Sequence, residues 1–174
     1  QVKEMGRERR MTFIARRKLL GRKEQGERIP ALLFEPLERH QRMSAVMVVH
    51  SKGKAALVDT RAGRPKKEVA DLLHRGFTVL TIDPFSIGES VLTPATKKSP
   101  LYTTTYNQTC AARRVQDIVT SLSWLQQQRH IRSVALIGLD DAGLWCLMAR
   151  AFCPKPVRTA VNLNRFDVDD DRCW

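Results

Sequence analysis

The chain has 174 residues, of which 43% are hydrophobic and 28% charged, values typical of globular domains. No apolar run approaches the ~18 residues that a bilayer span needs, so no membrane span is predicted, and no charged-then-apolar signal segment opens the chain. Because the chain begins at Gln1 rather than methionine, we expect a processed or excised sequence. Its localisation is left open, with an extracellular or periplasmic site expected if an N-terminal signal was removed.

The net charge of +12 is concentrated near the N-terminus. Residues 1–28 hold ten Lys and Arg against four Glu, and residues 1–12 are predicted as a basic arm. Such a segment can bind nucleic acid or another anionic partner by releasing counterions. Aromatic side chains for base stacking do not alternate with the basic ones, which favours a solvated arm or an exposed strand.

Two strands joined by a turn are predicted next. Residues 13–23 and 28–35 carry the strand patterns, and Gly26 supplies the turn of an antiparallel hairpin. Pro30 predicts that the second strand lies near a sheet edge, because proline cannot donate a ladder hydrogen bond.

Four short apolar runs rich in β-branched residues follow, at residues 45–50, 77–83, 133–138 and 160–163. Strands that are apolar on both faces are typical of parallel sheets covered by helices. Helical patterns lie at residues 66–74, 111–128 and 142–152, the first stopped by Gly76 and the last by Pro154. This alternation predicts right-handed crossovers and a three-layer α/β domain with a mostly parallel sheet over residues 13–174.

Three polar loops follow the carboxyl ends of predicted strands, where open α/β sheets have their sites. They are residues 50–53, 83–90 and 138–143, and their candidate site residues are His50, Ser51, Lys52, Asp83, Gly88, Ser90, Asp140 and Asp141. Residues 93–109 form a stretch long enough to be expected over a site.

The third loop has the pattern of a nucleophile elbow, a tight strand-to-helix turn. Gly138, Asp140 and Ala142 fit Gly-x-nucleophile-x-Gly, with alanine in place of the second glycine. The helix N-terminus behind the turn stabilises a developing negative charge. Asp140 is therefore the candidate at the nucleophile position.

In their order and spacing these motifs resemble the α/β-hydrolase superfamily, and within it acetyl xylan esterase-like proteins. The residues behind the resemblance are GERIPALLFEP at 26–36, Tyr106 and Asn107 before RRVQDI at 113–118, and GLDDAGLW at 138–145. Residues 50–53 resemble the family's oxyanion loop, and residues 83–90 its Asp-x-Arg-Gly-x-Gly-x-Ser loop, with Phe85 and Ser86 replacing Arg and Gly. The resemblance covers most of residues 26–171. It implies an ester hydrolase whose oxyanion hole uses backbone N–H groups near Ser51 and of Asp141.

Two departures from the family bear on activity. Asp140 replaces the nucleophilic serine, and an ester intermediate formed on a carboxylate still needs a histidine base for its hydrolysis. The family's histidine follows the last strand, whereas every histidine here precedes the elbow: His40, His50, His74 and His130. We therefore expect a domain that is incomplete at its C-terminus, with weak or no activity.

The remaining candidates have structural interpretations. Ser90 is expected to bond its own loop, and His50 to order the first loop rather than act as a base. Asp140 and Asp141 are adjacent in a turn and point in different directions, and the acidic run at 167–171 lacks calcium-loop spacing, so no metal site is predicted. No Gly-x-Gly-x-x-Gly triplet follows a strand, and no cofactor is predicted.

Two functional hypotheses follow. The first is an esterase-like hydrolase with a degenerate elbow, whose substrate is an acylated carbohydrate or another small ester. The second is a non-catalytic basic module that uses the hydrolase scaffold and residues 1–28 to bind an anionic partner.

Overall fold

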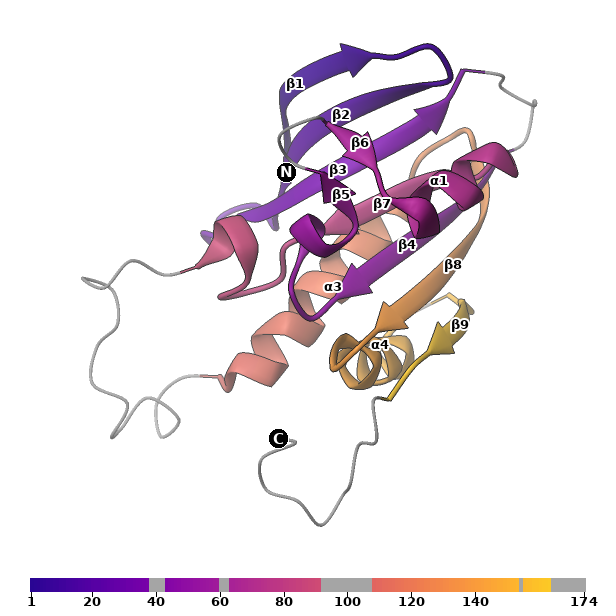
Figure 1. The fold of residues 1–174 in the computed structure, drawn as a ribbon. Coiled ribbons are helices and arrows are strands. Elements are labelled where there is room, and N and C mark those ends of the chain that lie inside the picture. The colour runs from indigo at the N-terminus through magenta and orange to yellow at the C-terminus, as the bar shows by residue number, and fades with distance from the viewer. Residues whose placement is uncertain (38–42, 60–62, 92–107, 154, 164–174) are drawn as a thin grey trace.

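A single mixed sheet forms the centre of the molecule in the computed structural model, which describes residues 1–37, 43–59, 63–91, 108–153 and 155–163 (Figure 1). The strand order is β1-β2-β3-β7-β4-β8-β9. The strands β7, β4, β8 and β9 are parallel, whereas β1, β2 and β3 are joined antiparallel and β3 is antiparallel to β7. Their bounds are Val2–Arg9 (β1), Phe13–Leu20 (β2), Ile29–Pro36 (β3), Met43–His50 (β4), Thr78–Ile82 (β7), Ile131–Leu139 (β8) and Arg158–Val161 (β9).

Helices cover both faces of this sheet. Helix α1 (Lys67–His74) packs on one face together with the short strands β5 (Val58–Asp59) and β6 (Arg64–Pro65), and α3 (Cys110–Gln126) and α4 (Ala142–Ala151) pack on the other. Each face has its own apolar core, one around Val69 and Val79 and the other around Ile118 and Leu80. The predicted three-layer α/β architecture is confirmed. Within the described residues, no helix is long and apolar enough to cross a membrane.

The predicted helices and parallel strands lie where the sequence patterns indicate, within one or two residues at most ends. Helix α3 begins after Thr109, whose side-chain oxygen accepts a hydrogen bond from the N–H of Ala112 at 3.1 Å. Helix α1 ends before Gly76, which has φ 83° and so adopts the left-handed conformation of a helix stop.

The predicted hairpin is formed by β2 and β3, but the position inferred from Pro30 is wrong, because β3 lies inside the sheet between β2 and β7. Pro30 stands opposite Asp83, whose N–H donates to the carbonyl of Pro30 at 2.9 Å. The carbonyl of Asp83, which an N–H at position 30 would have reached, accepts the hydroxyl of Ser90 at 3.0 Å instead. A side chain thus replaces the ladder bond that proline cannot make, and an interior position is tolerated.

The basic N-terminal segment is an exposed strand, one of the two forms expected from the sequence. Residues 2–9 form β1, an exposed edge strand paired with β2. Glu4 accepts hydrogen bonds from Arg16 at 3.3 Å and from Lys18 at 3.2 Å, which ties β1 to its neighbour. The basic N-terminal residues are therefore displayed on an ordered hairpin.

Candidate functional site

The three polar loops lie at one edge of the sheet. Strand β4 ends at His50, whose register partner is Leu139 at the end of β8, and β7 pairs with the other side of β4. Because these three strands are parallel, the loops at 50–53, 83–90 and 138–143 all emerge at their carboxyl ends.

Asp140 occupies a strained turn between β8 and α4. Its φ is 58°, a left-handed conformation that is uncommon outside glycine, and its carbonyl accepts the N–H of Gly143 at 2.9 Å. A Cβ at Gly138 would lie 2.8 Å from the Cα of Gly143, and one at Gly143 would lie 1.9 Å from the carbonyl oxygen of Asn162. The turn therefore has the shape that the elbow pattern predicts, with α4 packed directly against the strands behind it.

The hydroxyl of Ser51 donates a hydrogen bond to the carboxylate of Asp140, which joins the first loop to the third. The first loop is a tight turn, closed by the N–H of Gly53 on the carbonyl of His50 at 2.9 Å. The N–H of Lys52 donates to Nδ1 of His50 at 3.1 Å, the contact through which His50 would order the loop. Ser51 and Asp140 are both half-buried, and Lys52 and Asp141 are exposed.

Asp83 has a structural environment. Its buried carboxylate accepts the backbone N–H of Lys54 at 2.7 Å, the Nζ of Lys54 at 2.7 Å and the N–H of Glu89 at 2.9 Å. A Cβ at Gly53 or at Gly88 would lie 2.4 Å from this carboxyl group. Asp83 thus binds the first two loops together, and Gly88 leaves room for it.

Sequence reasoning missed the buried Lys54, which follows the first loop. Its side chain is only 4% exposed and also lies 3.2 Å from the exposed carboxylate of Glu89. Lysine is almost never fully buried without a partner, so composition gave no reason to expect it here. The only signal was its position directly after a loop that faces Asp83.

A second missed residue, Asp117 of α3, holds the second loop. Its carboxylate accepts the N–H of Phe85 at 2.8 Å, and Nε of Arg114 donates to the carbonyl of Phe85 at 3.2 Å. The Arg114 guanidinium also stacks 4.5 Å from the ring of Trp145 on α4, the helix that follows the elbow. Burial raises the pKa of Asp117 to about 7. A sequence signal existed, because Asp117 falls on the buried stripe of an amphipathic helix.

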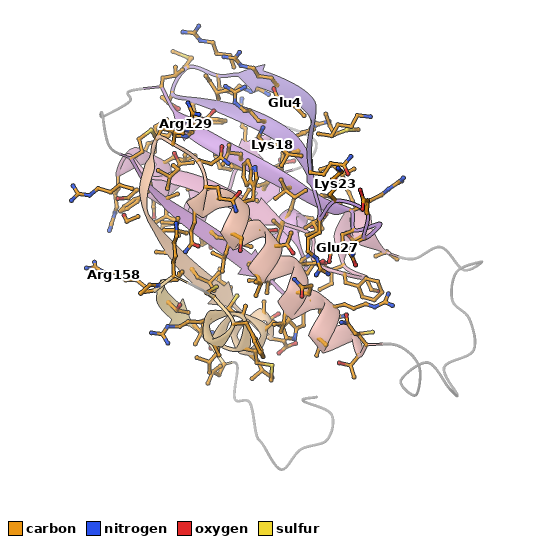
Figure 2. The ribbon with its side chains drawn as sticks, turned by 180° about the vertical axis from the view of Figure 1, so that it is seen from behind. Glu4, Lys18, Lys23, Glu27, Arg129 and Arg158 are labelled. Carbon is orange, nitrogen blue, oxygen red and sulfur yellow. The ribbon has the colours of Figure 1, made fainter. Side chains whose placement is uncertain are left out.

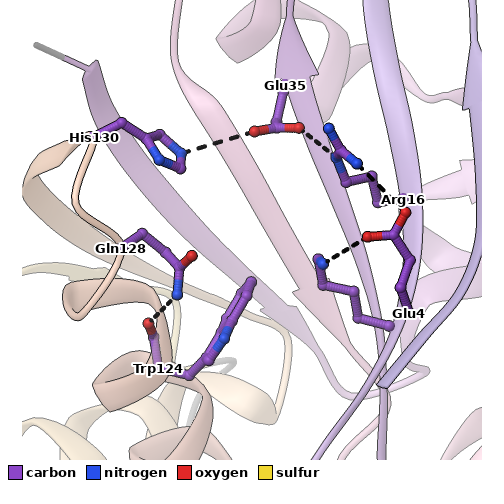
Figure 3. Close-up of polar contacts among 7 residues, drawn as sticks. Glu4, Arg16, Glu35, Trp124, Gln128 and His130 are labelled. Carbon is purple, nitrogen blue, oxygen red and sulfur yellow. Dashed lines mark hydrogen bonds and ion pairs between the residues drawn. The ribbon is translucent and has the colours of Figure 1, made fainter. Parts of the chain in front are cut away.

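Among the described histidines, only His50 lies at this edge. His74 ends α1, and His130 precedes β8, so both are at the opposite edge of the parallel strands. Figure 3 shows His130 beside Glu35, with Nε2 3.7 Å from Oε1, and Arg16 bonded to the other oxygen of Glu35 at 2.6 Å. His40, the loop predicted at 93–109 except for its last two residues, and the acidic run at 167–171 lie outside the described residues.

In the described part of the chain, no group of three or more His, Cys, Asp or Glu side chains could hold a metal ion. Burial raises the pKa of the Cys146 thiol to about 12, so this cysteine is a packing residue of α4. The chemistry that the site offers is that of the Ser51 hydroxyl, the Asp140 carboxylate and the N-terminus of α4.

Comparisons with known proteins agree with this geometry at the level of the fold. No family model matches the sequence, and no curated protein is significantly similar to it. An acetyl xylan esterase from Thermoanaerobacterium has a TM-score of 0.64 and 13% identity over 91% of this chain and 50% of its own. A glucuronoyl esterase from Solibacter usitatus has a TM-score of 0.58 and 14% identity over 87% of this chain and 48% of its own. A protein from Pseudomonas aeruginosa described as hypothetical has a TM-score of 0.63 and 17% identity over 87% of this chain and 43% of its own.

These likenesses establish the α/β-hydrolase fold, with esterases among the similar structures. The chain spans about half the length of the acetyl xylan and glucuronoyl esterases that it matches.

Proposed function

We propose that the three-loop edge is an ester-binding hydrolase site, with Asp140 at the position of the fold's nucleophile and an acylated carbohydrate or another small carboxylic ester as substrate. The observation that carries the proposal is the left-handed turn at Asp140, with its carboxylate bonded by Ser51. Strain of this kind is concentrated at functional sites, because the surrounding structure must hold it. The positive end of the α4 dipole lies directly behind the turn and favours negative charge there.

Turnover by this chain is expected to be weak. Efficient ester hydrolysis uses a histidine as general base, and the only described histidine at this edge, His50, has its Nδ1 bonded to the N–H of Lys52. Ordinary carboxylates are weaker bases than imidazole, since their pKa values are roughly 4 against 6.5. A site that relies on Asp140 is therefore expected to be slow.

Replacing Asp140 by alanine is expected to lower the hydrolysis of p-nitrophenyl acetate by about 100-fold or to the rate without protein, which is the usual loss when a positioned acid–base group is removed. The release of p-nitrophenol measures this. Asp71→Ala on the exposed side of α1 is the control, and circular dichroism checks that both variants fold. Equal turnover in Asp140→Ala and the unchanged protein would remove Asp140 from the mechanism.

A second function, binding of a polyanion, is favoured by the basic residues of the segment 1–28, which holds β1, β2 and the loop that leads into β3. Five of them are exposed and form no ion pair within the described residues: Lys3, Arg7, Arg9, Arg17 and Arg28. Arg7, Arg17 and Arg28 also line a groove of about 1350 Å³, in which Leu32 is among the apolar lining residues. Guanidinium groups without carboxylate partners in one groove can bind phosphate or sulfate groups.

The triple variant Arg7→Ala/Arg17→Ala/Arg28→Ala is expected to bind a short DNA duplex, used as a generic polyanion, more weakly and with less dependence on salt. The slope of log affinity against log salt should fall by about 0.9 for each phosphate that the variant no longer neutralises. The control Lys67→Ala/Lys155→Ala/Arg158→Ala removes the same charge from exposed positions elsewhere. Figure 2 shows Arg158 well apart from Lys23, which lies in the loop between β2 and β3. Equal slopes for the two variants, measured by fluorescence anisotropy, would contradict a groove-specific site.

A further inference from the structure

The hydrogen bond between Ser51 and Asp140 bears on which atom attacks the substrate. A carboxylate that attacks the acyl carbon of a carboxylic ester forms a mixed anhydride, which is higher in energy than the ester it replaces. A hydroxyl that attacks the same carbon forms another ester, so the exchange is nearly balanced. The proposed substrate class therefore disfavours Asp140 as the nucleophile and favours a hydroxyl group.

Ser51 is the hydroxyl in position. It donates to Oδ2 of Asp140 from the neighbouring loop, and both side chains are half-buried. A nucleophile and a base within hydrogen-bond reach are the signature of an activated serine. Ser90, the other hydroxyl considered from the sequence, donates to the carbonyl of Asp83 and so belongs to the loop's own structure.

Both partners are held by their backbones. The turn that carries Ser51 is closed by the bond from Gly53 to His50 and is followed by Lys54, whose backbone and side chain are both bonded to Asp83. The turn that carries Asp140 is closed by the bond from Gly143. A base needs a group that orients it, and in this site the strained turn supplies that orientation.

We infer that Ser51 and Asp140 form a catalytic dyad, with Ser51 of the first loop as nucleophile and Asp140 of the elbow as general base. This inference rests on the proposed ester-hydrolase function. The Ser51 oxygen bonds to the acyl carbon while its proton passes to Asp140, and the bond to the leaving alkoxide breaks as the alkoxide takes that proton. Water then cleaves the acyl-serine, with Asp140 accepting and returning one proton, which releases the acid and restores the hydroxyl.

The test combines turnover with identification of the acylated residue. The protein is mixed with p-nitrophenyl acetate, quenched in acid and digested, and the peptides are analysed by mass spectrometry. We expect an acetyl group on Ser51, its loss in Ser51→Ala, and strongly reduced acetylation in Asp140→Asn, which keeps the shape but not the base. Ser44→Ala, at the other end of β4, is the control and should acetylate and turn over as the unchanged protein does.

A parallel reaction in ¹⁸O-labelled water separates the alternatives. Incorporation of ¹⁸O into the Asp140 carboxyl with no acetyl-serine would make Asp140 the nucleophile and overturn the dyad while keeping the proposed function. Turnover that depends on Asp140 but survives in Ser51→Ala would overturn the dyad in the same way. Turnover that is independent of Asp140 would remove Asp140 from the mechanism and overturn the dyad, whereas absent turnover would reject the ester-hydrolase function itself.

Discussion

Replacing Lys54 by methionine is expected to lower the free energy of unfolding by about 3–5 kcal/mol, because the buried carboxylate of Asp83 is left without its counter-charge. The two side chains are 4% and 3% exposed and their charged atoms lie 2.7 Å apart. Urea unfolding followed by tryptophan fluorescence measures the change. Lys67→Met, at an exposed position of α1, is the control and should stay within about 0.5 kcal/mol of the unchanged protein. A loss below about 1 kcal/mol for Lys54→Met would contradict a buried pair.

A double-mutant cycle separates charge from packing. Asp83→Asn removes the negative charge and keeps one oxygen, which can accept only one of the two backbone N–H groups, because those of Lys54 and Glu89 bond to different carboxylate oxygens. In the variant that combines Lys54→Met with Asp83→Asn no charge is buried, so its loss should be smaller than the sum of the single losses by about 0.5–3 kcal/mol. Additive losses would mean that the ion pair is not what holds the first two loops together.

The central strands and the helices could be predicted because their periodicity reflects burial. Val115, Ile118, Leu122 and Leu125 recur at helical spacing and are all buried against the sheet in α3. Strand β1 could not be predicted in this way. Its sequence, VKEMGRER, is charged on both faces and exposed, and it forms a strand only because β2 offers a pairing edge.

The site was predictable in its place but not in its contacts. Each loop follows an apolar strand, so the common edge of residues 50–53, 83–90 and 138–143 could be deduced. Ser51 and Asp140 are 89 residues apart in the chain, and Lys54 and Asp83 are 29 apart. Which side chains of two neighbouring loops meet depends on turn geometry that local patterns do not encode. The contacts by which Asp83 and Gly88 join the first two loops were therefore not foreseen.

The interior position of β3 shows the same limit. Proline at position 30 favours an edge strand on statistical grounds, and the sequence contains no local sign that Ser90 will satisfy the carbonyl of Asp83. That Pro30 is tolerated in an interior strand could be recognised only from the positions of β3, β7 and the second loop together.

Gly143→Ala is expected to destabilise the protein by about 1–3 kcal/mol or more, because overpacking against backbone cannot be relieved by a rotamer change. The added Cβ would lie 1.9 Å from the carbonyl oxygen of Asn162 and 2.7 Å from its carbonyl carbon. Alanine is the better helix former by about 1 kcal/mol, so the steric cost must exceed a propensity gain before any loss is measured. A measured loss would therefore be a lower bound on the steric conflict between α4 and the chain after β9.

The matched control is Gly6→Ala in β1, where the added Cβ meets no atom within 4 Å and φ is not positive. It should change the free energy of unfolding by no more than about 0.5 kcal/mol in the same urea titration. Because the N–H of Gly143 closes the turn at Asp140, a shift of α4 should also displace the elbow, so any residual ester turnover should fall together with stability. If Gly143→Ala proves as stable as Gly6→Ala, stability does not depend on the close approach of α4 to the backbone at Asn162. Gly143 then cannot be what fixes Asp140 in its left-handed turn.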